Sequence, residues 1–317
     1  MDINIKKDID RGILIIKRLV DAYKNRKLFK FNELPENNLP EDLEVGSNEH
    51  LLYLSFVSGI AYLRREERLW AAARETYDDE NLRYVFNPKE VIRHPLEEVE
   101  SNLKEYGLFI NLLVLKHWSI GKLKTVDRRS LRENDLEIWL NHANTLNDFS
   151  GDIKTLFESY DNNALKVFRA FTKLPYSSSF PTYHKPRKVE IWLARIRRYA
   201  RFEIKNMNEL PMPVGAHIIR ATFLPGAISG ELNSIHVDLD SLISDYWHEV
   251  AEVGKEELGL SPIEFQVFLW TLSKYGCSVG REGETCSLQE ECPLGDICSK
   301  GKFNVMDTYI SINLEQV

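Results

Sequence analysis

Apolar residues recur with a helical period along nearly the whole chain. Near the N-terminus, Ile13, Ile16 and Val20 stand three and four residues apart, which is the spacing of one face of an α-helix. A more fully apolar helix covers Leu51–Leu63. The same periodicity predicts helices over 66–77, 95–105, 109–116, 130–142, 151–158, 162–171, 187–204, 215–223, 238–253 and 262–275. Because no run alternates apolar and polar residues convincingly, the sequence predicts an all-α fold with more than one lobe.

The composition limits the class of protein. Of 317 residues, 43% are hydrophobic and 28% are charged, which is ordinary for a globular protein. The apolar stretches are too short or too interrupted to span a bilayer, and the N-terminal residues lack the apolar run of a signal peptide. We therefore expect a cytoplasmic protein. The formal net charge of −7 argues against non-specific coating of nucleic acid, since such binding needs a wide positive field.

One segment departs from this acidic balance. Two acidic residues, Glu190 and Glu203, stand among the basic residues of 185–205. This pattern fits either a solvated helix face or a local patch that binds nucleic acid. The basic residues are Lys185, Arg187, Lys188, Arg195, Arg197, Arg198, Arg201 and Lys205.

The four cysteines of the chain lie together near its C-terminus. They are Cys277, Cys286, Cys292 and Cys298, with the spacing C-x8-C-x5-C-x5-C. A reducing compartment disfavours disulfides, and the paired C-x2-4-C knuckles of structural zinc sites are absent. Four thiolates on a glycine-rich loop suit a 4Fe–4S cluster, whose ligands approach from several directions. Zinc is the alternative. Because the chain shows no flavin or haem motif, we expect the cluster to have a structural role.

Two segments before the cysteines carry a resemblance to a known family. The first, at 174–193, passes from the turn LPYSSSFPTYHKP into the start of a basic amphipathic helix. The second, LPMPVGAHIIR at 210–220, is a proline-stiffened loop that opens another helix. In order and character they resemble the helix-hairpin-helix DNA glycosylase superfamily, in which a hairpin and a lysine-bearing helix precede a segment of the form P-V-D-x-H. The endonuclease III-like branch then ends in a four-cysteine iron–sulfur loop, as this chain does.

The resemblance implies a two-lobed helical fold and a set of roles. The fold would comprise a helical barrel lobe with the hairpin at 65–205, and a second lobe built from 1–64 and 206–317. The second lobe would end in the cluster loop at 276–300. Lys188 stands at the position of the family's Schiff-base lysine and becomes the candidate nucleophile. The residues expected to contact DNA are Lys185, Arg187, Arg195, Arg198, Arg201 and Tyr183.

The chain departs from the family pattern at three places. The hairpin lacks the glycines of L-P-G-V-G, and the cysteine spacing is wider than usual. Gly215 stands where the catalytic aspartate is expected. A carboxylate there stabilises the positive charge that develops on the sugar, and glycine cannot replace it. Asp238 or Asp240 would have to supply the acid, although either could instead cap a helix.

Other residues allow two interpretations. Tyr176, Phe180 and Tyr183 are aromatic residues in a polar turn, where they either stack on an extruded base or pack within the loop. His217 and His236 fit hydrogen-bonded helix or loop residues better than acids or ligands. The tryptophans mostly occupy apolar helical positions and are expected in the core. They are Trp70, Trp118, Trp139, Trp192, Trp247 and Trp270.

These features together predict a DNA-binding, base-excision glycosylase-like protein that recognises a damaged or modified base. Lys188 would make it an N-glycosylase and AP lyase, and Gly215 indicates that activity has been lost or transferred to another acid. Two alternatives fit the same residues. One is a non-catalytic reader of modified DNA on a glycosylase scaffold. The other is a hydrolase of a free modified nucleoside, which the acidic net charge suits.

Overall fold

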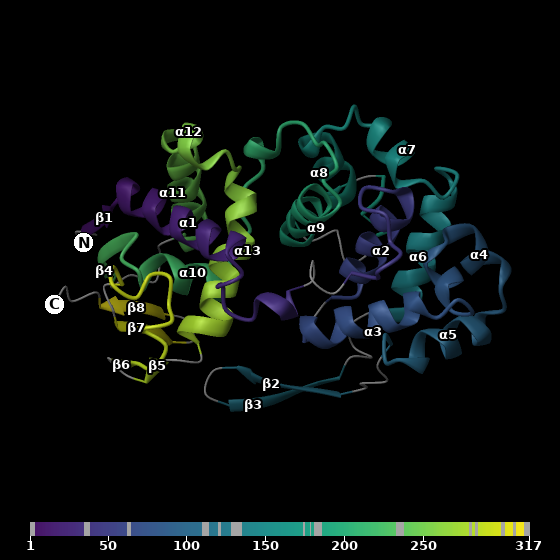
Figure 1. Ribbon diagram of the computed structural model, residues 1–317, viewed down its shortest axis with the longest axis horizontal. Coiled ribbons are helices and arrows are strands. Elements are labelled where there is room, and N and C mark those ends of the chain that lie inside the picture. Colours follow the sequence, from purple (N-terminus) through teal and green to yellow (C-terminus); the bar gives the residue numbers. More distant parts are fainter. Residues whose placement is uncertain are drawn as a thin grey trace. The chain divides into compact units, whose positions relative to one another are not determined.

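The structure is a computed structural model in which most of the chain is described. It describes residues 4–34, 39–61, 65–109, 114–119, 122–127, 135–173, 175–177, 179–180, 186–232, 238–278, 281–282, 285–298, 302–306 and 309–313. Within these ranges the chain forms thirteen α-helices and eight strands (Figure 1). The chain is therefore mostly helical, as the periodicity predicts.

The chain divides into two compact units. Unit 1 comprises Met1–Phe31 and Leu210–Val317, and unit 2 comprises Asn32–Glu209. The segment 32–64, which the sequence analysis assigned to the discontinuous lobe, instead belongs to the continuous unit. The reason is the helix α2 (Asn48–Gly59), which is buried from His50 to Gly59 and packs against other helices of unit 2.

Unit 2 is an assembly of helices around α2. Its other helices are α3 (Glu66–Asp78), α4 (Pro88–Arg93), α5 (Leu96–Glu105), α6 (Asp135–Asn147), α7 (Ile153–Glu158), α8 (Ala164–Thr172) and α9 (Pro186–Tyr199). The 3₁₀ turns Arg83–Phe86 and Met207–Glu209 also lie here, and the turn Phe31–Glu33 lies at the boundary. Helix α2 contacts α6, α7 and α9. An apolar helix of this kind can only be stable when neighbours cover all its sides.

Large aromatic side chains fill the space between α2 and its neighbours. The rings of Phe56 and Trp139 stack with centroids 4.6 Å apart. Two of the buried tryptophans have an acceptor for the indole nitrogen: Trp139 Nε1 donates to Val85 O at 2.8 Å, and Trp192 Nε1 donates to Ser55 Oγ at 2.9 Å. Such bonds allow a tryptophan to be buried without leaving its N–H unsatisfied. The prediction that Trp70, Trp139, Trp192 and Trp247 belong to the core is confirmed.

Two strands replace one of the predicted helices. The helix expected over 109–116 is wrong, because β2 (Val114–Ser119) pairs antiparallel with β3 (Lys122–Asp127). The register joins Ser119 to Lys122 and Val114 to Asp127. The segments VLKHWS and KLKTVD contain β-branched and aromatic residues, which favour strands. A short apolar run does not by itself distinguish a helix from a strand, so only the pairing decides.

Unit 1 packs five α-helices and one π-helix around a single core. They are α1 (Ile9–Lys24), α10 (Ala216–Phe223), α11 (Leu239–Val253), α12 (Lys255–Leu258), α13 (Pro262–Thr271) and the π-helix η7 (Leu272–Cys277). The core joins Ile16 of α1, Trp247 of α11 and Leu269 of α13. The Tyr246 hydroxyl reaches past Gly12 and donates to Asp8 O at 2.6 Å. A side chain at Gly12 would meet that tyrosine, so α1 and α11 approach closely only because of this glycine.

A four-stranded antiparallel sheet also belongs to unit 1, although the sequence analysis predicted no strands. Its order is β1 (Asn4–Lys7), β4 (Ile228–Leu232), β8 (Tyr309–Asn313) and β7 (Lys302–Met306). A separate two-stranded ladder pairs β5 (Arg281–Glu282) with β6 (Thr285–Cys286). Strand β1 finds its partner β4 far along the chain, with Asn4 opposite Glu231. Pairing over such a separation leaves no local pattern from which it could be predicted.

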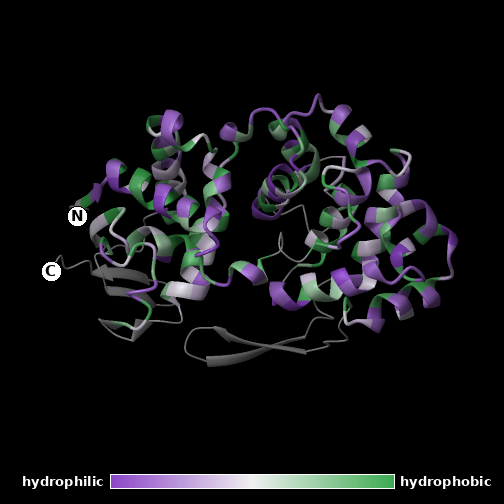
Figure 2. Ribbon diagram, viewed as in Figure 1, coloured by the Kyte–Doolittle hydropathy of each residue, from purple (hydrophilic) through white to green (hydrophobic). Residues whose placement is uncertain are grey.

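Apart from the fully buried α2, helices of both units such as α1 and α9 carry hydrophobic and hydrophilic residues along the same length (Figure 2). This is the amphipathic pattern of helices that cover a protein core. In the described ranges, no helix combines the length and apolar character needed to cross a lipid bilayer.

Candidate metal centre and basic helix

The four cysteines lie where α13 and its π-helical continuation end and a series of turns begins. Cys277 is the last residue of η7, and Cys286 is the last residue of β6. Consecutive turns then carry Cys292 and Cys298. Cys292 N donates to Gln289 O at 3.3 Å, and Cys298 N donates to Leu294 O at 2.8 Å. π-Helical turns are rare and are frequently found at functional sites.

The thiols influence one another, which places them in one neighbourhood. The pKa of the Cys277 thiol is raised to about 12. Burial is the largest cause, and the thiols of Cys298, Cys292 and Cys286 add to it. The pKa of Cys292 rises to about 11, again through burial first and then through Cys298 and Cys286. Such mutual effects decline with distance. Within the described ranges, however, no three His, Cys, Asp or Glu side chains form a group that could hold a metal ion.

The donor set nevertheless has the chemistry of a thiolate-bound metal centre. Desolvated thiols of raised pKa are neutral at pH 7, and they ionise when a cation is supplied to them. The backbone N–H of Leu294 donates to Cys292 Sγ at 3.5 Å. The Cys298 thiol donates to Leu224 O at 3.5 Å. N–H groups directed at cysteine sulfurs are among the features that set the potential of iron–sulfur clusters.

Three arginines tie the cysteine loop to the helices of unit 1. Arg11 Nε donates to Pro225 O at 2.6 Å, and its guanidinium also donates to Ile297 O. Arg18 forms an ion pair with Asp296. Arg220 Nη1 donates to Ser278 Oγ at 2.8 Å, and its positive charge opposes the rise in the pKa of the Cys277 thiol. The loop is thus held mainly by polar contacts.

Apolar contacts add little to this loop. Leu294 is buried in the core of unit 1, and Cys277, Cys292 and Ile297 pack partly against that core. Gly276 permits the close approach of Phe29, because a Cβ atom there would lie 2.6 Å from the Phe29 ring. Gly276 therefore fixes the position from which Cys277 projects.

The basic helix expected after the hairpin is α9, and its residues have different surroundings. Arg187 is exposed and Lys188 is half-buried. Arg201 is also exposed and follows the end of the helix, in the left-handed region at φ 54°. Arg198 is half-buried. Lys185 and Tyr183 lie outside the described residues.

Arg195 was expected to contact DNA, and the structure shows instead that its side chain is buried. Only 8% of the residue is exposed, because its guanidinium forms an ion pair with Glu66 at 2.8 Å and donates to Ser58 Oγ at 3.2 Å. It also lies over the Trp70 ring, 5.5 Å from the centroid. A buried guanidinium paired in this way holds α9 within unit 2 and cannot reach a phosphate. The sequence could not reveal this, since Arg195 shares its segment with the exposed basic residues.

Glu190 is a buried acid that the sequence analysis treated only as a counter-charge. It lies on α9 and is 3% exposed. Burial raises its pKa to about 8, and the nearby Arg187 offsets only part of that shift. The carboxyl group is therefore neutral at pH 7 and can donate a proton. The sequence feature that could have indicated its burial is its place between Val189 and Trp192, two core positions of the same helix.

Gly215 begins α10 in an ordinary extended conformation. Its backbone angles are φ −156° and ψ 176°, and no side chain caps the helix. Any residue can adopt these angles, so the backbone itself does not require glycine there. Lys188 belongs to unit 2, whereas Gly215, Asp238 and Asp240 belong to unit 1.

The two aspartates proposed as substitute acids lie at the start of α11. Asp238 is its N-cap: Ser241 N donates to Asp238 Oδ1 at 3.1 Å, and Ser241 Oγ donates to Oδ2 at 2.7 Å. The hydroxyl and backbone donors of Ser241 lower the pKa of Asp238. Asp240 occupies the first turn of the same helix. The capping interpretation therefore accounts for Asp238.

The described aromatic and histidine candidates pack against or lie within hydrogen-bond distance of other residues of the protein. Phe180 is fully buried against Phe171, with ring centroids 4.6 Å apart, and Tyr176 packs on both rings. His217 Nδ1 lies 3.1 Å from Ser273 Oγ. Burial lowers the pKa of His217 to about 4, and Arg220 and Lys274 lower it further. His236 lies outside the described residues.

The comparison with known proteins adds no family to this picture. No protein-family model matches the chain, and no curated protein matches it. The functional proposal therefore rests on the chemistry of the cysteine loop and of α9.

Proposed function

We propose that this chain is a DNA-directed, base-excision glycosylase-like protein whose cysteine loop holds a 4Fe–4S cluster. The observation that carries the proposal is the succession of four cysteines that begins at the end of η7, with thiols that raise one another's pKa, in a chain whose other unit presents the basic helix α9. Cys277, Cys286, Cys292 and Cys298 would hold the cluster. The bound cluster would supply folding energy to the loop. Arg187, Arg198 and Arg201 would contact the phosphate backbone, and Lys185 and Tyr183 would extend that contact.

A second candidate is favoured by Gly215 and Asp238. Glycine cannot stabilise an oxocarbenium ion, and the Asp238 carboxylate is engaged as a helix cap. A non-catalytic reader of modified DNA needs neither group. Both candidates require duplex binding, and they differ only in whether Lys188 attacks the sugar. Binding and chemistry are therefore tested separately.

DNA binding is tested by reversing charge at the N-terminus of α9. Arg187→Glu should weaken duplex affinity and make its salt dependence shallower, because each lost phosphate contact removes about one unit from the slope of log affinity against log salt. Fluorescence anisotropy over a salt series measures both quantities. Arg93→Glu is the matched control, since Arg93 is an exposed arginine on α4 of the same unit. Equal affinity and slope in the two variants and the parent would remove the support for a DNA-binding α9.

Chemistry is tested at Lys188 and Gly215. If the protein acts on a modified base, borohydride should trap a covalent protein–DNA adduct, and Lys188→Gln should abolish the adduct while Lys166→Gln on α8 leaves it intact. Gly215→Asp should raise the rate, because a carboxylate near the sugar stabilises the developing charge by about 3 kcal/mol. The extended backbone of Gly215 accepts this substitution, and aspartate is a preferred N-cap.

The outcomes separate the two candidates. An inert but folded Gly215→Asp variant that still binds duplex DNA tightly indicates the reader. A parent protein that binds no duplex rejects both candidates and leaves hydrolysis of a free nucleoside.

A further inference from the structure

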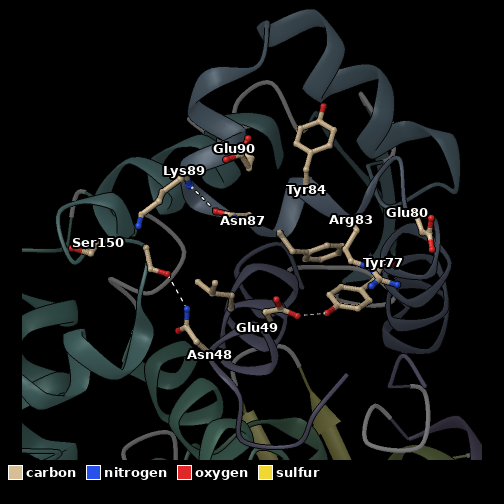
Figure 3. Close-up of a pocket in the computed structure, with 13 residues that line it drawn as sticks. Asn48, Glu49, Tyr77, Glu80, Arg83, Tyr84, Asn87, Lys89, Glu90 and Ser150 are labelled. Carbon is tan, nitrogen blue, oxygen red and sulfur yellow. Dashed lines mark hydrogen bonds between the residues drawn. The ribbon is translucent and has the colours of Figure 1, made fainter. Parts of the chain in front are cut away.

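Unit 2 contains a pocket that the proposed function does not use. It has a volume of about 470 Å³ and is formed by the start of α2, the end of α3, the turn Arg83–Phe86, the start of α4 and the bend at Ser150 and Gly151 (Figure 3). Pockets of this size accommodate small molecules. The spacing of the charged and apolar side chains around it decides which kind.

One wall of the pocket is apolar. Leu52 on α2, Tyr77 on α3 and Phe86 are buried residues that line it. The rings of Tyr77 and Phe86 lie 5.6 Å apart between centroids. Leu52 follows Asn48 and Glu49 by one turn of α2, so it shares a helix face with both. This wall offers contact to a hydrocarbon chain and no charge of its own.

Some charged residues at the pocket are already engaged. Arg83 Nε donates to Tyr77 O at 2.9 Å, and its guanidinium lies over the Tyr77 ring, 4.8 Å from the centroid. Glu90 pairs with Arg93 at 2.8 Å. These groups build the walls and do not balance the charge of a ligand. Glu80 also lines the pocket, and no ligand contact is assigned to it.

Glu49 supplies a negative charge at one side of the pocket. The Tyr77 hydroxyl donates to Glu49 Oε2 at 2.9 Å, which holds the carboxylate in place without compensating its charge. Among the described residues no cation pairs with Glu49. A carboxylate has two oxygens and accepts several hydrogen bonds. This group can therefore accept a further bond from an ammonium group.

Lys89 supplies a positive charge at another side. Its backbone N–H donates to Asn87 Oδ1 at 3.0 Å, and its aliphatic stem passes Gly151, where a Cβ atom would lie 3.5 Å from Lys89 Cε. The ammonium group points toward Ser150, away from Tyr77 (Figure 3). Within the described part of the chain no carboxylate pairs with it. This side attracts an anionic group.

The first turn of α2 separates the two charged groups. Asn48 Nδ2 donates to Gly151 O at 3.0 Å, on the side where Lys89 passes Gly151. The next residue, Glu49, is bonded instead to Tyr77 of α3. Figure 3 shows both bonds, with Asn48 and Glu49 extending in different directions. A ligand that meets both charged groups must therefore carry its own two charges apart, and a ligand with both charges on one carbon meets only one of them.

We propose that this pocket binds a linear ω-amino acid, an aliphatic chain with an ammonium group at one end and a carboxylate at the other. The ammonium group faces Glu49, the carboxylate faces Lys89, and the methylene chain lies against Leu52 and Phe86. A simple amine would leave Lys89 unpaired, and a simple carboxylate would leave Glu49 unpaired. The proposal goes beyond the proposed function and depends neither on DNA binding nor on the cysteine loop.

Calorimetry on the full-length protein tests this site with the ω-amino acids from 4-aminobutanoate to 8-aminooctanoate. At least one should bind, and affinity should rise with chain length until the chain reaches both charged groups. Three comparison compounds share the chain length of the best ligand: the simple amine, the simple carboxylate and the α-amino acid isomer, which is L-norleucine for 6-aminohexanoate. Each should bind at least about tenfold more weakly, because each leaves a charged hydrogen bond unmade.

Two variants assign the two ends of the ligand. Glu49→Gln should weaken binding of the best ω-amino acid by about tenfold or more and remove most of its advantage over the simple carboxylate. Lys89→Met should weaken it to a similar extent and remove most of its advantage over the simple amine. Glu97→Gln on α5 and Lys166→Met on α8 are the matched controls, because both residues are exposed and lie outside the pocket.

The folding of each variant is checked by circular dichroism, and Glu49→Gln keeps an acceptor for the Tyr77 hydroxyl. The controls should bind as the parent does. The proposal is overturned if no ω-amino acid of the series binds or if either folded variant, Glu49→Gln or Lys89→Met, keeps the parent's affinity. It is also overturned if the amine, the carboxylate or the α-amino acid isomer binds as tightly as the best ω-amino acid.

Discussion

Cys277→Ser should remove bound iron and lower the free energy of unfolding of unit 1 by roughly 3–5 kcal/mol, because loss of a structural metal is among the causes of unusually large single-substitution effects. The reason is the small apolar contribution of the cysteine loop, since Leu294 is the one buried hydrophobic side chain among its described residues. A thiolate-bound cluster, as proposed, would therefore supply much of its folding energy. Protein purified without oxygen should contain about four irons per chain and absorb broadly near ~400 nm. Iron analysis, the visible spectrum and thermal unfolding measure the effect.

The matched control is Ser278→Ala, the next residue along the chain. It removes the contact of Arg220 with the Ser278 hydroxyl but no thiol, so iron content should stay the same and stability should change by only about 1 kcal/mol. Anaerobically prepared protein with one zinc and no iron would falsify the iron–sulfur assignment. An iron-free Cys277→Ser variant with the parent's stability would contradict the structural role of the metal.

The second large effect should come from Glu190. Its folded-state pKa of about 8 lies above the ordinary glutamate value of 4.5, so the folded protein holds this proton more tightly than the unfolded chain does. The stability that the neutral carboxyl contributes is complete below pH 4.5 and is lost as the pH rises to about 8. Glu190→Gln does not titrate. Its advantage over the parent should therefore grow across this window, reach about 5 kcal/mol, and level off above it, since the two pKa values lie about 3.5 apart and each pKa unit corresponds to about 1.4 kcal/mol.

Urea unfolding of the parent and of Glu190→Gln from pH 4.5 to pH 9 measures this difference. Glu203→Gln is the control, because the Glu203 side chain is exposed and its removal should leave the pH profile unchanged. If the free energy of unfolding changed with pH in the same way for the parent and Glu190→Gln, ionisation of the Glu190 carboxyl would not destabilise the folded protein. Should a reaction on DNA be found, a parent rate that falls as the pH rises through about 8, and the absence of that fall in Glu190→Gln, would identify this group as a proton donor.

Local sequence pattern was sufficient for most of the helices. The predicted helices over 66–77, 215–223 and 238–253 correspond to α3, α10 and α11. A helix buries one face, so its apolar residues recur every three to four positions. This period can be recognised within a short segment of sequence. The pattern failed for 109–116, where β2 pairs with β3.

The cysteine cluster was also visible in the sequence, because its four residues are close along the chain. The structure adds that their thiols affect one another's pKa and that Arg11, Arg18 and Arg220 hold the loop. Those arginines lie far from the cysteines in the sequence. Nothing near them along the chain distinguishes them from surface arginines.

What the sequence determined by itself is the helical class of this protein and the grouping of its four thiols, since both depend on neighbours along the chain. Tertiary structure alone decided which charges of α9 are buried: Arg195 pairs with Glu66, Glu190 is held neutral, and Arg187 stays in solvent. It also decided the pairing of β1 with β4. The physical reason is common to both cases. Burial and strand pairing are set by residues distant in sequence. The residues next to a charged side chain along the chain are the same whether that side chain is buried against a partner or exposed to water.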